Sequence, residues 1–419
     1  MHFLLTALGS YGDVHPMVGL GATLRKRGHQ VTLITNPYFT DVVASAGLEL
    51  LSLGTAEEYL EMLNLPHLWH PYRAIGLVFR IAVAGKLREL YRLVDSNYVA
   101  GETTLVAHPL DAASRVYHEA HRAPLAAVTY SPVSFWSDQA PPDLGTPTVS
   151  HLMPWWANRA QFWLGNRLVI ERALRHELDA LRRDVGLGPS PPPFPNWWYQ
   201  ADLNLALFPD WFARPQPGWP QGLALAGFPL WDGGDSRPLT GPLEEFLGAG
   251  EPPLVFAPGS ANRQAEAFFQ TVVAICQRLG RRGVLLTKYA EQVPSPLPCS
   301  IHHEPFVPLR RLLARSALVV HHGGIGTSSQ ALAAGIPQLI RPLAFDQFDN
   351  ADRLMNLGVA NEIWPRRFTT QRATAAINQL LTSDDVATNC QRWKAKCDGS
   401  AALDQAGNLL ERVGLGATN

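Results

Sequence analysis

The chain has 419 residues, of which 46% are hydrophobic and 17% are charged, and its formal net charge is −1. This length favours two or three domains, the hydrophobic content excludes a disordered chain, and the near-zero charge gives no electrostatic reason to expect nucleic acid as a partner. The four cysteines show no metal-ligand spacing and no apolar run is long enough to span a membrane, so we expect a cytoplasmic globular protein.

The first forty residues alternate between strand and helix patterns. The run "HFLLTAL" is typical of a buried strand, "MVGLGATLRKRG" of a helix and "HQVTLIT" of a second strand. This order predicts a βαβ unit with parallel strands. Because proline is unfavourable inside a helix, we expect the helix to begin at or after Pro16. Further strand patterns at "TTLVAH" and "APLAAVTY" flank a helix pattern, so we predict an α/β domain over residues 1–225.

A second alternation follows a segment rich in proline and glycine, which we predict to be a linker over residues 226–245. Strand patterns at "PLVFAPGS", "VLLTK", "ALVVHHGG" and "IPQLIRP" are separated by helix patterns. They predict a second α/β domain over 246–395, and 396–419 is predicted as a C-terminal helix that crosses back to the first domain. Two doubly wound domains facing across a cleft would place ligands beyond the carboxyl ends of their strands.

Two glycine-rich corners, "LGSYGDVHP" and "HHGGIGTSS", each lie between a strand pattern and a helix pattern. In the second corner, three glycines let the backbone approach a ligand closely, namely Gly323, Gly324 and Gly326. Thr327 is the predicted N-cap, and His322 adds a hydrogen-bond donor beside the helix N-terminus, which attracts anions. The corner therefore predicts a phosphate site, although tight packing of strand on helix is an alternative explanation.

Metal and dinucleotide sites are disfavoured by the same residues. Adjacent side chains of a strand point to opposite faces, so His321 and His322 are poorly placed to chelate one ion, and the chain contains no Asp-x-Asp pair. The N-terminal corner lacks the G-x-G-x-x-G spacing, and the second strand ends in Asn36 instead of an acidic residue. We therefore expect no metal and no dinucleotide cofactor.

The segment "FVPLRRLLARSALVVHHGGIGTSSQALAAGIPQLIRPLAFDQFDNADRL" resembles the donor-binding signature of inverting, nucleotide-sugar-dependent glycosyltransferases of family 1, which have the GT-B fold. "GSYGDVHP" resembles the acceptor-side loop of the bacterial and sterol-glucosyltransferase branch. "LFPDWFARPQPGWPQGLALAGFPLWDG" is similar to the bacterial rhamnosyltransferases that make rhamnolipids. The resemblance covers both domains and implies a metal-independent enzyme.

The resemblance also implies roles for individual residues at the donor site. His322, with Gly324, Gly326 and Thr327, corresponds to the group that contacts the donor pyrophosphate, and Ser260 to a phosphate-facing loop. Phe306 with Val307 corresponds to the positions that contact the nucleobase, and Gln330 to the position that contacts the ribose. Asp346 with Gln347 corresponds to the pair that contacts the sugar hydroxyls. Many members of the family have an acidic residue at the position of Gln330.

Asp13 stands where the family has its catalytic base, and the resemblance implies that it accepts the proton of the acceptor hydroxyl. Capping of the following helix is the alternative role, which the expected start at Pro16 disfavours. His15 could assist Asp13, and His108 with Asp111 is a second candidate pair on the acceptor side.

The resemblance implies a donor of the dTDP-rhamnose or UDP-glucose type. Nine of the twelve tryptophans lie between Trp136 and Trp231, which suits an apolar, lipid-like acceptor or contact of "MPWWANRAQFWLG" with the inner face of a membrane. A sterol, polyketide or phenolic acceptor is the alternative within the same class of enzyme. An alternative of another class is a non-catalytic protein that only binds nucleotide sugars.

Overall fold

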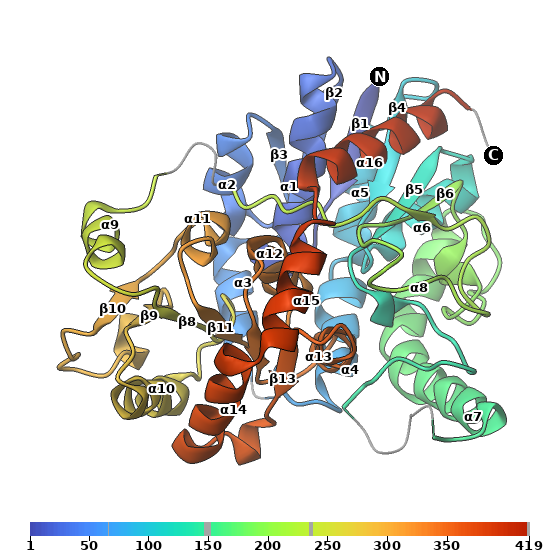
Figure 1. The fold of residues 1–419 in the computed structure, drawn as a ribbon. Helices are drawn as coiled ribbons and strands as arrows, with labels where there is room; N and C mark the ends of the chain where they lie inside the picture. The colour runs from blue at the N-terminus through green and yellow to red at the C-terminus, as the bar shows by residue number, and fades with distance from the viewer. Residues whose placement is uncertain (66, 146–151, 234–237, 417–419) are drawn as a thin grey trace. The chain divides into compact units, whose positions relative to one another are not determined.

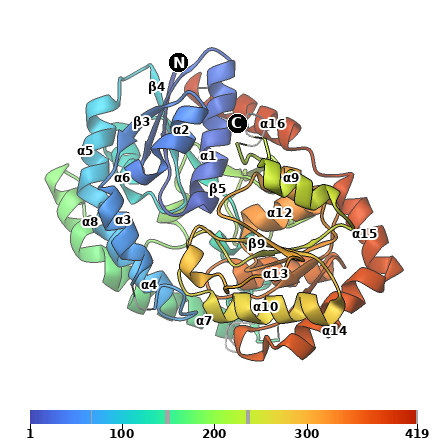
Figure 2. The same ribbon diagram turned by 90° about the vertical axis from the view of Figure 1, so that its left-hand side faces the viewer.

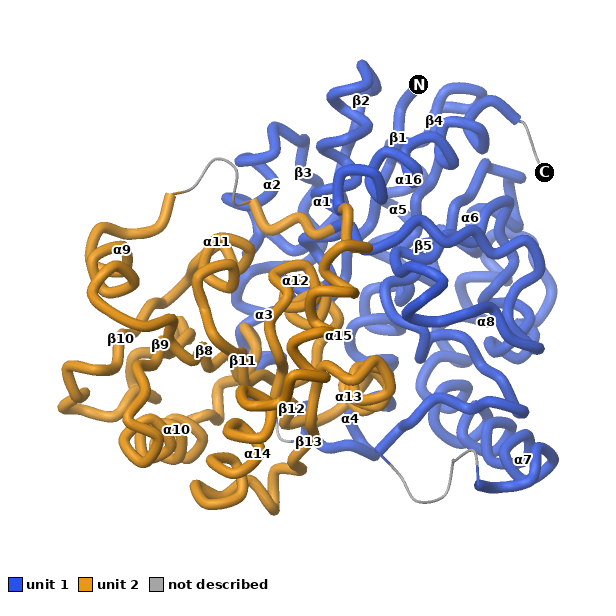
Figure 3. Tube along the Cα trace, viewed as in Figure 1, with its two compact units in different colours: residues 1–229, 399–419 blue, residues 230–398 orange. Residues whose placement is uncertain are grey.

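Residues 1–65, 67–145, 152–233 and 238–416 are described in a computed structural model of the chain (Figure 1). They divide into two compact units (Figure 3): unit 1 comprises Met1–Pro229 with Gly399–Asn419, and unit 2 comprises Leu230–Asp398. Residues 234–237 of the predicted linker and residues 146–151 of the segment rich in proline and tryptophan lie outside the described residues.

Unit 1 is built on a seven-stranded sheet with the order β3-β2-β1-β4-β5-β6-β7. Its strands pair in parallel throughout, and the central ones are almost continuously apolar because helices cover both faces. The strands are β1 (His2–Thr6), β2 (Gln30–Thr35), β3 (Glu49–Ser52), β4 (Thr103–Ala107), β5 (Leu125–Thr129), β6 (Leu203–Ala206) and β7 (Ala224–Leu225).

The helices of unit 1 cover its sheet from two sides. Its α-helices are α1 (Tyr11–Lys26), α2 (Thr40–Ser45), α3 (Ala56–Leu63), α4 (Ala74–Val78), α5 (Leu87–Asn97), α6 (Ala112–His121), α7 (Trp155–Gly165), α8 (Arg172–Asp184) and α16 (Gly399–Gly414). Shorter turns are η1 (Pro37–Phe39), η3 (Pro132–Ser134) and η5 (Trp197–Tyr199), and η2 (Phe79–Ala84) and η4 (Asn166–Glu171) are π-helical. Helices α5, α6 and α8 pack over one apolar core with the sheet.

Helix α16 packs beside α1 (Figure 2), so the two ends of the chain meet in unit 1. Arg27, which follows α1, forms ion pairs with Asp404 at 3.1 Å and Glu411 at 3.2 Å, and His29 Nε2 lies 2.8 Å from a Glu411 carboxylate oxygen. The apolar face of α16 is buried at Ala406 and other positions of the same helical stripe. The last helix of the chain is thus part of the unit that the first strand begins.

Unit 2 is built on a six-stranded parallel sheet with the order β10-β9-β8-β11-β12-β13. The strands are β8 (Leu254–Ala257), β9 (Gly283–Leu286), β10 (Ile301–Glu304), β11 (Leu318–His321), β12 (Gln338–Ile340) and β13 (Ala360–Glu362). The helices are α9 (Gly241–Gly248), α10 (Glu266–Leu279), α11 (Leu309–Leu313), α12 (Ile325–Ala334), α13 (Gln347–Asn356), α14 (Thr370–Thr382) and α15 (Asp384–Lys394), with short turns η6 (Ala290–Gln292) and η7 (Pro365–Arg367).

Successive residues along the strands of unit 2 pack into two different hydrophobic cores, one on each face of the sheet. Phe256 and Val320 pack with residues of α10 and α14, whereas their neighbours Val255 and Val319 pack with residues of α9, α11 and α12. This period of two is the expected pattern for strands covered on both faces. The predicted α/β class with two doubly wound sheets is confirmed.

Each sheet has one point where the strand order reverses direction. In unit 1 this switch lies between β1 and β4, and in unit 2 it lies between β8 and β11. Loops that leave neighbouring strands in opposite directions open a crevice at such a point, which is where ligands bind in open α/β sheets. The two glycine-rich corners follow β1 and β11, so each lies at the switch point of its own sheet.

No helix among the described residues is long and apolar enough to cross a membrane.

Candidate active site

Asp13 lies in the first turn of α1, which follows the switch-point strand β1. Its Oδ2 accepts hydrogen bonds from the Ser10 amide at 2.7 Å and from the Ser10 hydroxyl at 3.3 Å, and the two residues form a capping box. Gly9 has a φ of 132°, and a side chain there would collide with the Asp13 carboxylate. Only glycine therefore lets this carboxylate fold back over the turn.

The expected start of α1 at or after Pro16 is wrong, because the helix begins at Tyr11 and includes the proline. Pro16 removes one backbone hydrogen bond, but the capping box holds the first turn in its place. Asp13 therefore does cap the helix with Oδ2. This leaves Oδ1 for another task, and the side chain remains 32% exposed.

His108, which follows the other switch-point strand β4, supplies the partner of Oδ1. Its Nδ1 accepts a hydrogen bond from the Leu110 amide at 3.0 Å, so the proton of the neutral ring is on Nε2. Nε2 lies 3.4 Å from Asp13 Oδ1 and donates toward it. With only 1% of its surface exposed, the imidazole is held in one orientation.

The predicted pair of His108 with Asp111 is not formed by their side chains. Asp111 Oδ2 accepts from the Thr6 hydroxyl at 2.8 Å and Oδ1 from the Ser114 amide at 2.9 Å, where Asp111 caps α6. Thr6 in turn accepts from the His108 amide at 2.9 Å. Asp111 thus fixes the backbone of His108, whose ring is directed to Asp13.

Aromatic rings surround this pair. The Tyr130 ring at the end of β5 lies 5.3 Å from the His108 ring, and burial together with the Asp13 charge raises the pKa of Tyr130 well above its usual value. His15 packs edge-on against Tyr11 with ring centroids 5.3 Å apart. Tyr130 is therefore close to both His108 and Asp13.

Asn36, at the end of β2, holds the neighbouring loop. Its Nδ2 donates to the Leu53 carbonyl at 3.2 Å and to the Thr55 carbonyl at 2.8 Å, and its Oδ1 accepts from the Tyr38 amide at 3.0 Å. Both ends of the amide are engaged within the protein. This is consistent with the expectation that the N-terminal corner is not a dinucleotide site.

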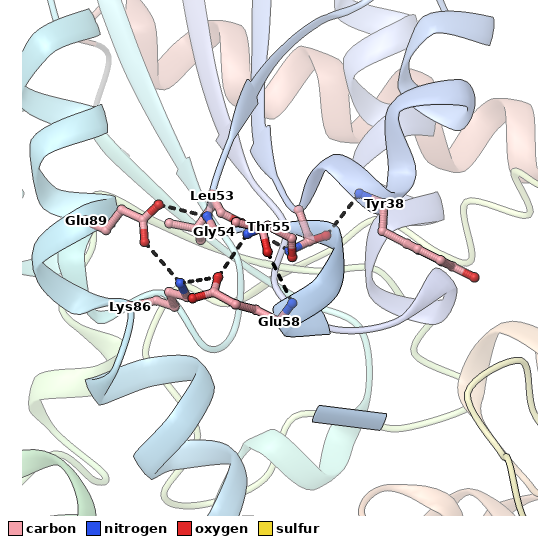
Figure 4. Close-up of polar contacts among 8 residues, drawn as sticks. Tyr38, Leu53, Gly54, Thr55, Glu58, Lys86 and Glu89 are labelled. Carbon is pink, nitrogen blue, oxygen red and sulfur yellow. Dashed lines mark hydrogen bonds and ion pairs between the residues drawn. The ribbon is translucent and has the colours of Figure 1, made fainter. Parts of the chain in front are cut away.

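Lys86 forms ion pairs near the same loop of unit 1 (Figure 4). Its ammonium group lies 2.7 Å from Glu58 Oε2 and 3.2 Å from Glu89 Oε2. Glu89 also accepts from the Gly54 amide at 2.8 Å, and Glu58 accepts from the Thr55 amide at 2.9 Å. These contacts connect the loop after β3 to α3 and α5 and hold the loop in place at this edge of unit 1.

The glycine-rich corner of unit 2 begins its helix three residues earlier than expected. Helix α12 starts at Ile325 with Gly324 as N-cap, so the predicted N-cap at Thr327 is wrong and Thr327 is the third helical residue. Amides of a first turn have no partner within the helix, and they attract anions. Gly323 has a φ of 93°, and a Cβ there would lie 2.8 Å from the Ile340 side chain. The glycine is thus required by its fold as well as by access for a ligand.

His322 lies between two glycine backbones at the switch point. A Cβ on Gly324 would lie 2.5 Å from its Nε2, and one on Gly259, in the turn after β8, would lie 3.4 Å from its ring. Burial lowers the pKa of His322 to about 4, against a smaller opposing effect of the Ala257 carbonyl. Its Nδ1 makes no well-formed hydrogen bond with any described residue. At neutral pH the ring is therefore an uncharged donor beside the α12 N-terminus.

His321 has a different task from His322. Its Nδ1 accepts from the Gly323 amide at 3.1 Å, and its Nε2 donates to Gln338 Oε1 at 2.9 Å. Burial lowers the pKa of His321 to about 3, and both ring nitrogens are used to hold the glycine turn. In the described part of the chain, no group of three or more His, Cys, Asp or Glu side chains is arranged to hold a metal ion.

Asp346 and Asn350 link α13 to the same corner. Asp346 Oδ2 accepts from the Asn350 amide group at 2.7 Å and lies 3.4 Å from the Ile325 amide of α12. Asn350 also donates to the Gly323 carbonyl at 2.9 Å and is fully buried. Asn350 was not among the predicted site residues. The only sequence feature that links it to the site is its spacing of four residues from Asp346, which places both on one helix face.

Gln347 and Gln330, both predicted to contact the donor, are used partly by the protein itself. Gln347 is 3% exposed, and its Oε1 accepts from the Leu343 and Ala344 amides at 2.7 and 3.2 Å. Gln330 Nε2 donates to the Leu230 carbonyl at 2.9 Å, while its Oε1 is buried without a hydrogen bond to a described residue. Both predicted donor contacts are therefore buried side chains that hold neighbouring backbone of unit 2.

The remaining predicted donor residues lie at the carboxyl edge of the unit 2 sheet. Ser260 is exposed in the turn after β8, and Phe306 and Val307 lie in the loop after β10. Phe306 is half-buried with the Lys288 ammonium 5.8 Å from its ring centre, whereas Val307 is buried in the core under α9 and α11. The structure thus gathers the His322 corner, Asp346 and the Ser260 turn around the ends of β8 and β11.

Two domain families match separate parts of the chain, one in unit 1 and one almost entirely in unit 2. The N-terminal domain of glycosyltransferase family 28 matches residues 3–135, and the C-terminal domain of erythromycin biosynthesis protein CIII-like proteins matches residues 284–400. The Asp13 turn and His108 fall in the first match, and the His322 corner falls in the second.

Similar proteins extend over the whole chain. Glycosyltransferase GtfE of Amycolatopsis orientalis is 30% identical over 96% of this chain and 96% of its own length. O-mycaminosyltylonolide 6-deoxyallosyltransferase of Streptomyces fradiae is 29% identical over 98% of this chain and 97% of its own length. The chain therefore belongs to the family of glycosyltransferases that includes GtfE, and it is an enzyme that transfers a sugar.

Solved structures agree on the fold. The glycosyltransferase of kitacinnamycin has a TM-score of 0.76 at 20% identity and covers 98% of both chains. VinC in complex with DTDP has a TM-score of 0.71 at 19% identity and covers 99% of both chains. The predicted GT-B fold is confirmed.

Proposed function

We propose that the chain transfers a deoxyhexose from a thymidine diphosphate sugar to a hydroxyl group of an apolar acceptor, with inversion at the anomeric carbon and without a metal. The observation that carries this proposal is the arrangement of Asp13, which is oriented by Ser10 and by the neutral His108 ring while Oδ1 keeps only one long hydrogen bond. A carboxylate held in this way is suited to accept a proton in the transition state.

In this mechanism Asp13 takes the proton of the acceptor hydroxyl as the acceptor oxygen attacks the anomeric carbon. The new carbon–oxygen bond forms on the face opposite the diphosphate, whose own bond to that carbon breaks and whose oxygen keeps the electron pair. The first-turn amides of α12 and the neutral His322 donor stabilise the charge that develops there. His108 is a positioning residue, because it acts by orienting Asp13.

The donor assignment is supported by the related proteins. VinC and the spinosyn rhamnosyltransferase SpnG were crystallised with thymidine diphosphate, and the Streptomyces fradiae relative is named as a deoxyhexosyltransferase. The similarity of residues 207–233 to rhamnolipid-forming enzymes favours rhamnose as the sugar. UDP-glucose is the second candidate donor, since the neutral Gln330 leaves the choice of nucleotide to other contacts.

For the acceptor we propose a hydroxyl carried on an acyl chain, on the basis of that same similarity and of the apolar surroundings of unit 1. A polyketide-type natural product is the second candidate, which is favoured by the names of the related enzymes for tylosin-type and spinosyn products. Both candidates are apolar molecules that carry a hydroxyl group. They differ in shape, which makes them distinguishable by experiment.

The test is a matrix of donors and acceptors assayed with purified protein. Thymidine diphosphate rhamnose and UDP-glucose are each combined with a series of hydroxyacyl acceptors of rising length, below their critical micelle concentrations, and with a macrolide aglycone. Each buried methylene contributes about 0.8 kcal/mol, so transfer at low acceptor concentration should rise several-fold per carbon and then level off. Faster transfer to the macrolide than to every acyl chain contradicts the lipid assignment. Absence of both transfer and donor hydrolysis under all conditions contradicts the enzymatic proposal.

A further inference from the structure

The exposed large hydrophobic side chains of the described chain are concentrated on one segment of unit 1. Seven of the thirteen lie within residues 152–168, on α7 and the turns beside it: Leu152, Met153, Trp155, Trp156, Trp163, Leu164 and Leu168. The three tryptophans are between 55% and 63% exposed. Three other tryptophans of this half of the chain, Trp197, Trp198 and Trp219, are buried in the core. The exposed apolar side chains of unit 1 are therefore concentrated at α7 and the residues beside it.

The exposed face of α7 consists of two adjacent stripes with a spacing of four residues. One stripe alternates aromatic and basic side chains: Trp155, Arg159, Trp163 and Arg167. The Arg167 guanidinium lies 6.0 Å from the centre of the Trp163 ring. The other stripe is wholly apolar and exposed, with Trp156, Ala160, Leu164 and Leu168. Residues four apart share one side of an α-helix, so the members within α7 form a single amphipathic surface. Arg167 and Leu168 lie in the π-helical η4, and the Arg167–Trp163 contact links that segment to the surface.

The opposite face of α7 fixes the helix in unit 1. Ala157, Asn158 and Phe162 are buried, and the Phe162 ring lies 4.7 Å from the Trp136 ring. The Asn158 amide group donates to the Asp138 carbonyl at 3.3 Å. The helix therefore already has a core-facing side, and the tryptophan stripes are a second apolar face.

The charge of the surface around α7 is positive. Residues 152–175 contain four arginines and one acidic residue, Glu171, which lies 3.7 Å from Arg167 and 2.6 Å from Arg175, although the whole chain has a net charge of −1. Helix α4 contacts the same region, since a Cβ on Gly76 would lie 3.1 Å from Val169, and residues 67–85 contain two arginines and no acidic residue. Helix α4 adds the exposed Ile75, and the turn before it adds the exposed Tyr72.

We propose that this face, the tryptophan–arginine face, docks on the surface of an anionic lipid bilayer. Tryptophan rings suit the boundary between headgroups and acyl chains, because one edge is apolar and the indole N–H is polar. The arginines interact with lipid phosphates while their stems stay near the apolar stripe. A surface that is apolar and has a net positive charge, with Glu171 as an acidic residue beside Arg167, matches an anionic membrane better than a protein partner of unspecified charge. The proposal holds for any acceptor.

The test is flotation of the full chain with vesicles of phosphatidylcholine that contain either 30% phosphatidylglycerol or none. We expect binding to the anionic vesicles that weakens with added salt. The Arg159→Gln/Arg167→Gln variant should lose about fivefold in partitioning per arginine, and only on anionic vesicles. The Trp155→Ser/Trp163→Ser variant should lose about tenfold or more on anionic vesicles at both low and high salt.

Matched controls lie in unit 2, where Trp364 is 43% exposed and Arg372 is exposed. Trp364→Ser and Arg372→Gln should bind vesicles as the wild type does, and all variants should keep the wild-type melting temperature because the side chains are exposed. Wild-type protein that stays unbound at low salt, or variants that bind as well as the wild type, overturns the proposal. Light scattering that shows a wild-type dimer and a monomeric tryptophan variant overturns it in favour of a second copy of the chain. A higher acceptor KM of the tryptophan variant without vesicles, together with unchanged flotation, overturns it in favour of the acceptor.

Discussion

The protonation of His322 makes donor binding depend on pH in a defined direction. Burial lowers the pKa of His322 to about 4, so the free protein has a neutral ring at pH 7. A donor diphosphate beside the ring favours the charged form. Binding of the donor should therefore take up a proton, and affinity should rise as the pH falls toward the pKa of the free protein.

The size of this effect follows from two energies. Because the pKa of the ring is about three units below pH 7, protonating the ring at pH 7 costs about 4 kcal/mol. One charge-assisted hydrogen bond contributes about 1.5–3 kcal/mol. The ring should therefore stay neutral at pH 7, because only the difference of about 1–1.5 kcal/mol between a charge-assisted and a neutral hydrogen bond favours its protonation. Affinity should be flat above about pH 6 and rise about two- to fourfold toward about pH 4.5. Because a neutral hydrogen bond contributes about 0.5–1.5 kcal/mol, His322→Ala should lose only about two- to tenfold in affinity at pH 7.

Isothermal titration calorimetry checks this prediction directly. A thymidine diphosphate sugar is the suitable ligand, since its diphosphate has no oxygen that titrates in this range. Titrations in buffers of different ionisation enthalpy give the protons taken up, with nearly none expected at pH 7 and a measurable fraction at pH 5. His322→Ala should remove the uptake, and a variant of an exposed histidine in α8, His176→Ala, should retain it.

One result would refute the reasoning. Uptake of close to a full proton at pH 7, lost in His322→Ala, would show that the ring is an imidazolium in the complex. The leaving group would then be neutralised by a full charge, and burial would not control the state of the ring.

Four further predictions concern the two switch points. Asp13→Asn should lower kcat by about 10²–10⁴ at nearly unchanged donor affinity; a variant with near wild-type turnover would show that another group is the base. His108→Ala should lower kcat less than Asp13→Asn, with partial recovery in His108→Gln, which keeps an N–H donor; an equal loss in all three variants would contradict a positioning role. Transfer should continue in excess EDTA because the α12 amides and His322 neutralise the leaving group; activity that is lost on chelation and restored by Mg²⁺ or Mn²⁺ would contradict this. Since the pKa of His321 is lowered to about 3 from an ordinary 6.5, stability should be lost as the pH falls below about 6.5, and His321→Gln should lose about 2–3 kcal/mol less than the wild type between pH 7 and pH 4.5 in denaturant titrations.

The sequence pattern was sufficient for the architecture because buried parallel strands and their covering helices have strong signals. The runs before Asp13 and before His322 are apolar on both faces, so their strands and the corners after them could be placed without coordinates. Shorter elements had no such signal. Strand β13 contains Asn361 and Glu362, and β7 has only two residues, so neither pattern differs from that of a loop.

The helix starts could not be predicted because capping depends on local hydrogen bonds instead of residue preference alone. The Ser10–Asp13 capping box outweighs the cost of Pro16, and Gly324 caps α12 without a side-chain hydrogen bond. A box of this kind is visible in sequence only as a serine followed three residues later by an acid. The same spacing is compatible with a catalytic carboxylate, and in Asp13 the two oxygens divide the two roles.

Long-range polar contacts could not be predicted from the sequence pattern. Gln330 binds the Leu230 carbonyl from a hundred residues away, and Asn350 binds the Gly323 carbonyl across two helices. His108 was a candidate, but its partner could be identified only when β1 and β4 were seen to be neighbours. Pairings of this kind depend on which strands lie side by side, and periodicity does not specify that.

The return of α16 to unit 1 has a consequence for the order in which the protein matures during its synthesis. The ribosome makes β1 and α1 first, but Arg27 and His29 receive their partners Asp404 and Glu411 only when the last helix emerges. Domains usually fold in the order in which they are made. Here unit 2 is one uninterrupted stretch of chain and can fold as soon as it is complete, whereas unit 1 must wait with an uncovered face on α1 until α16 has been synthesised. Truncation of the final helix should therefore harm the first half of the chain rather than the second.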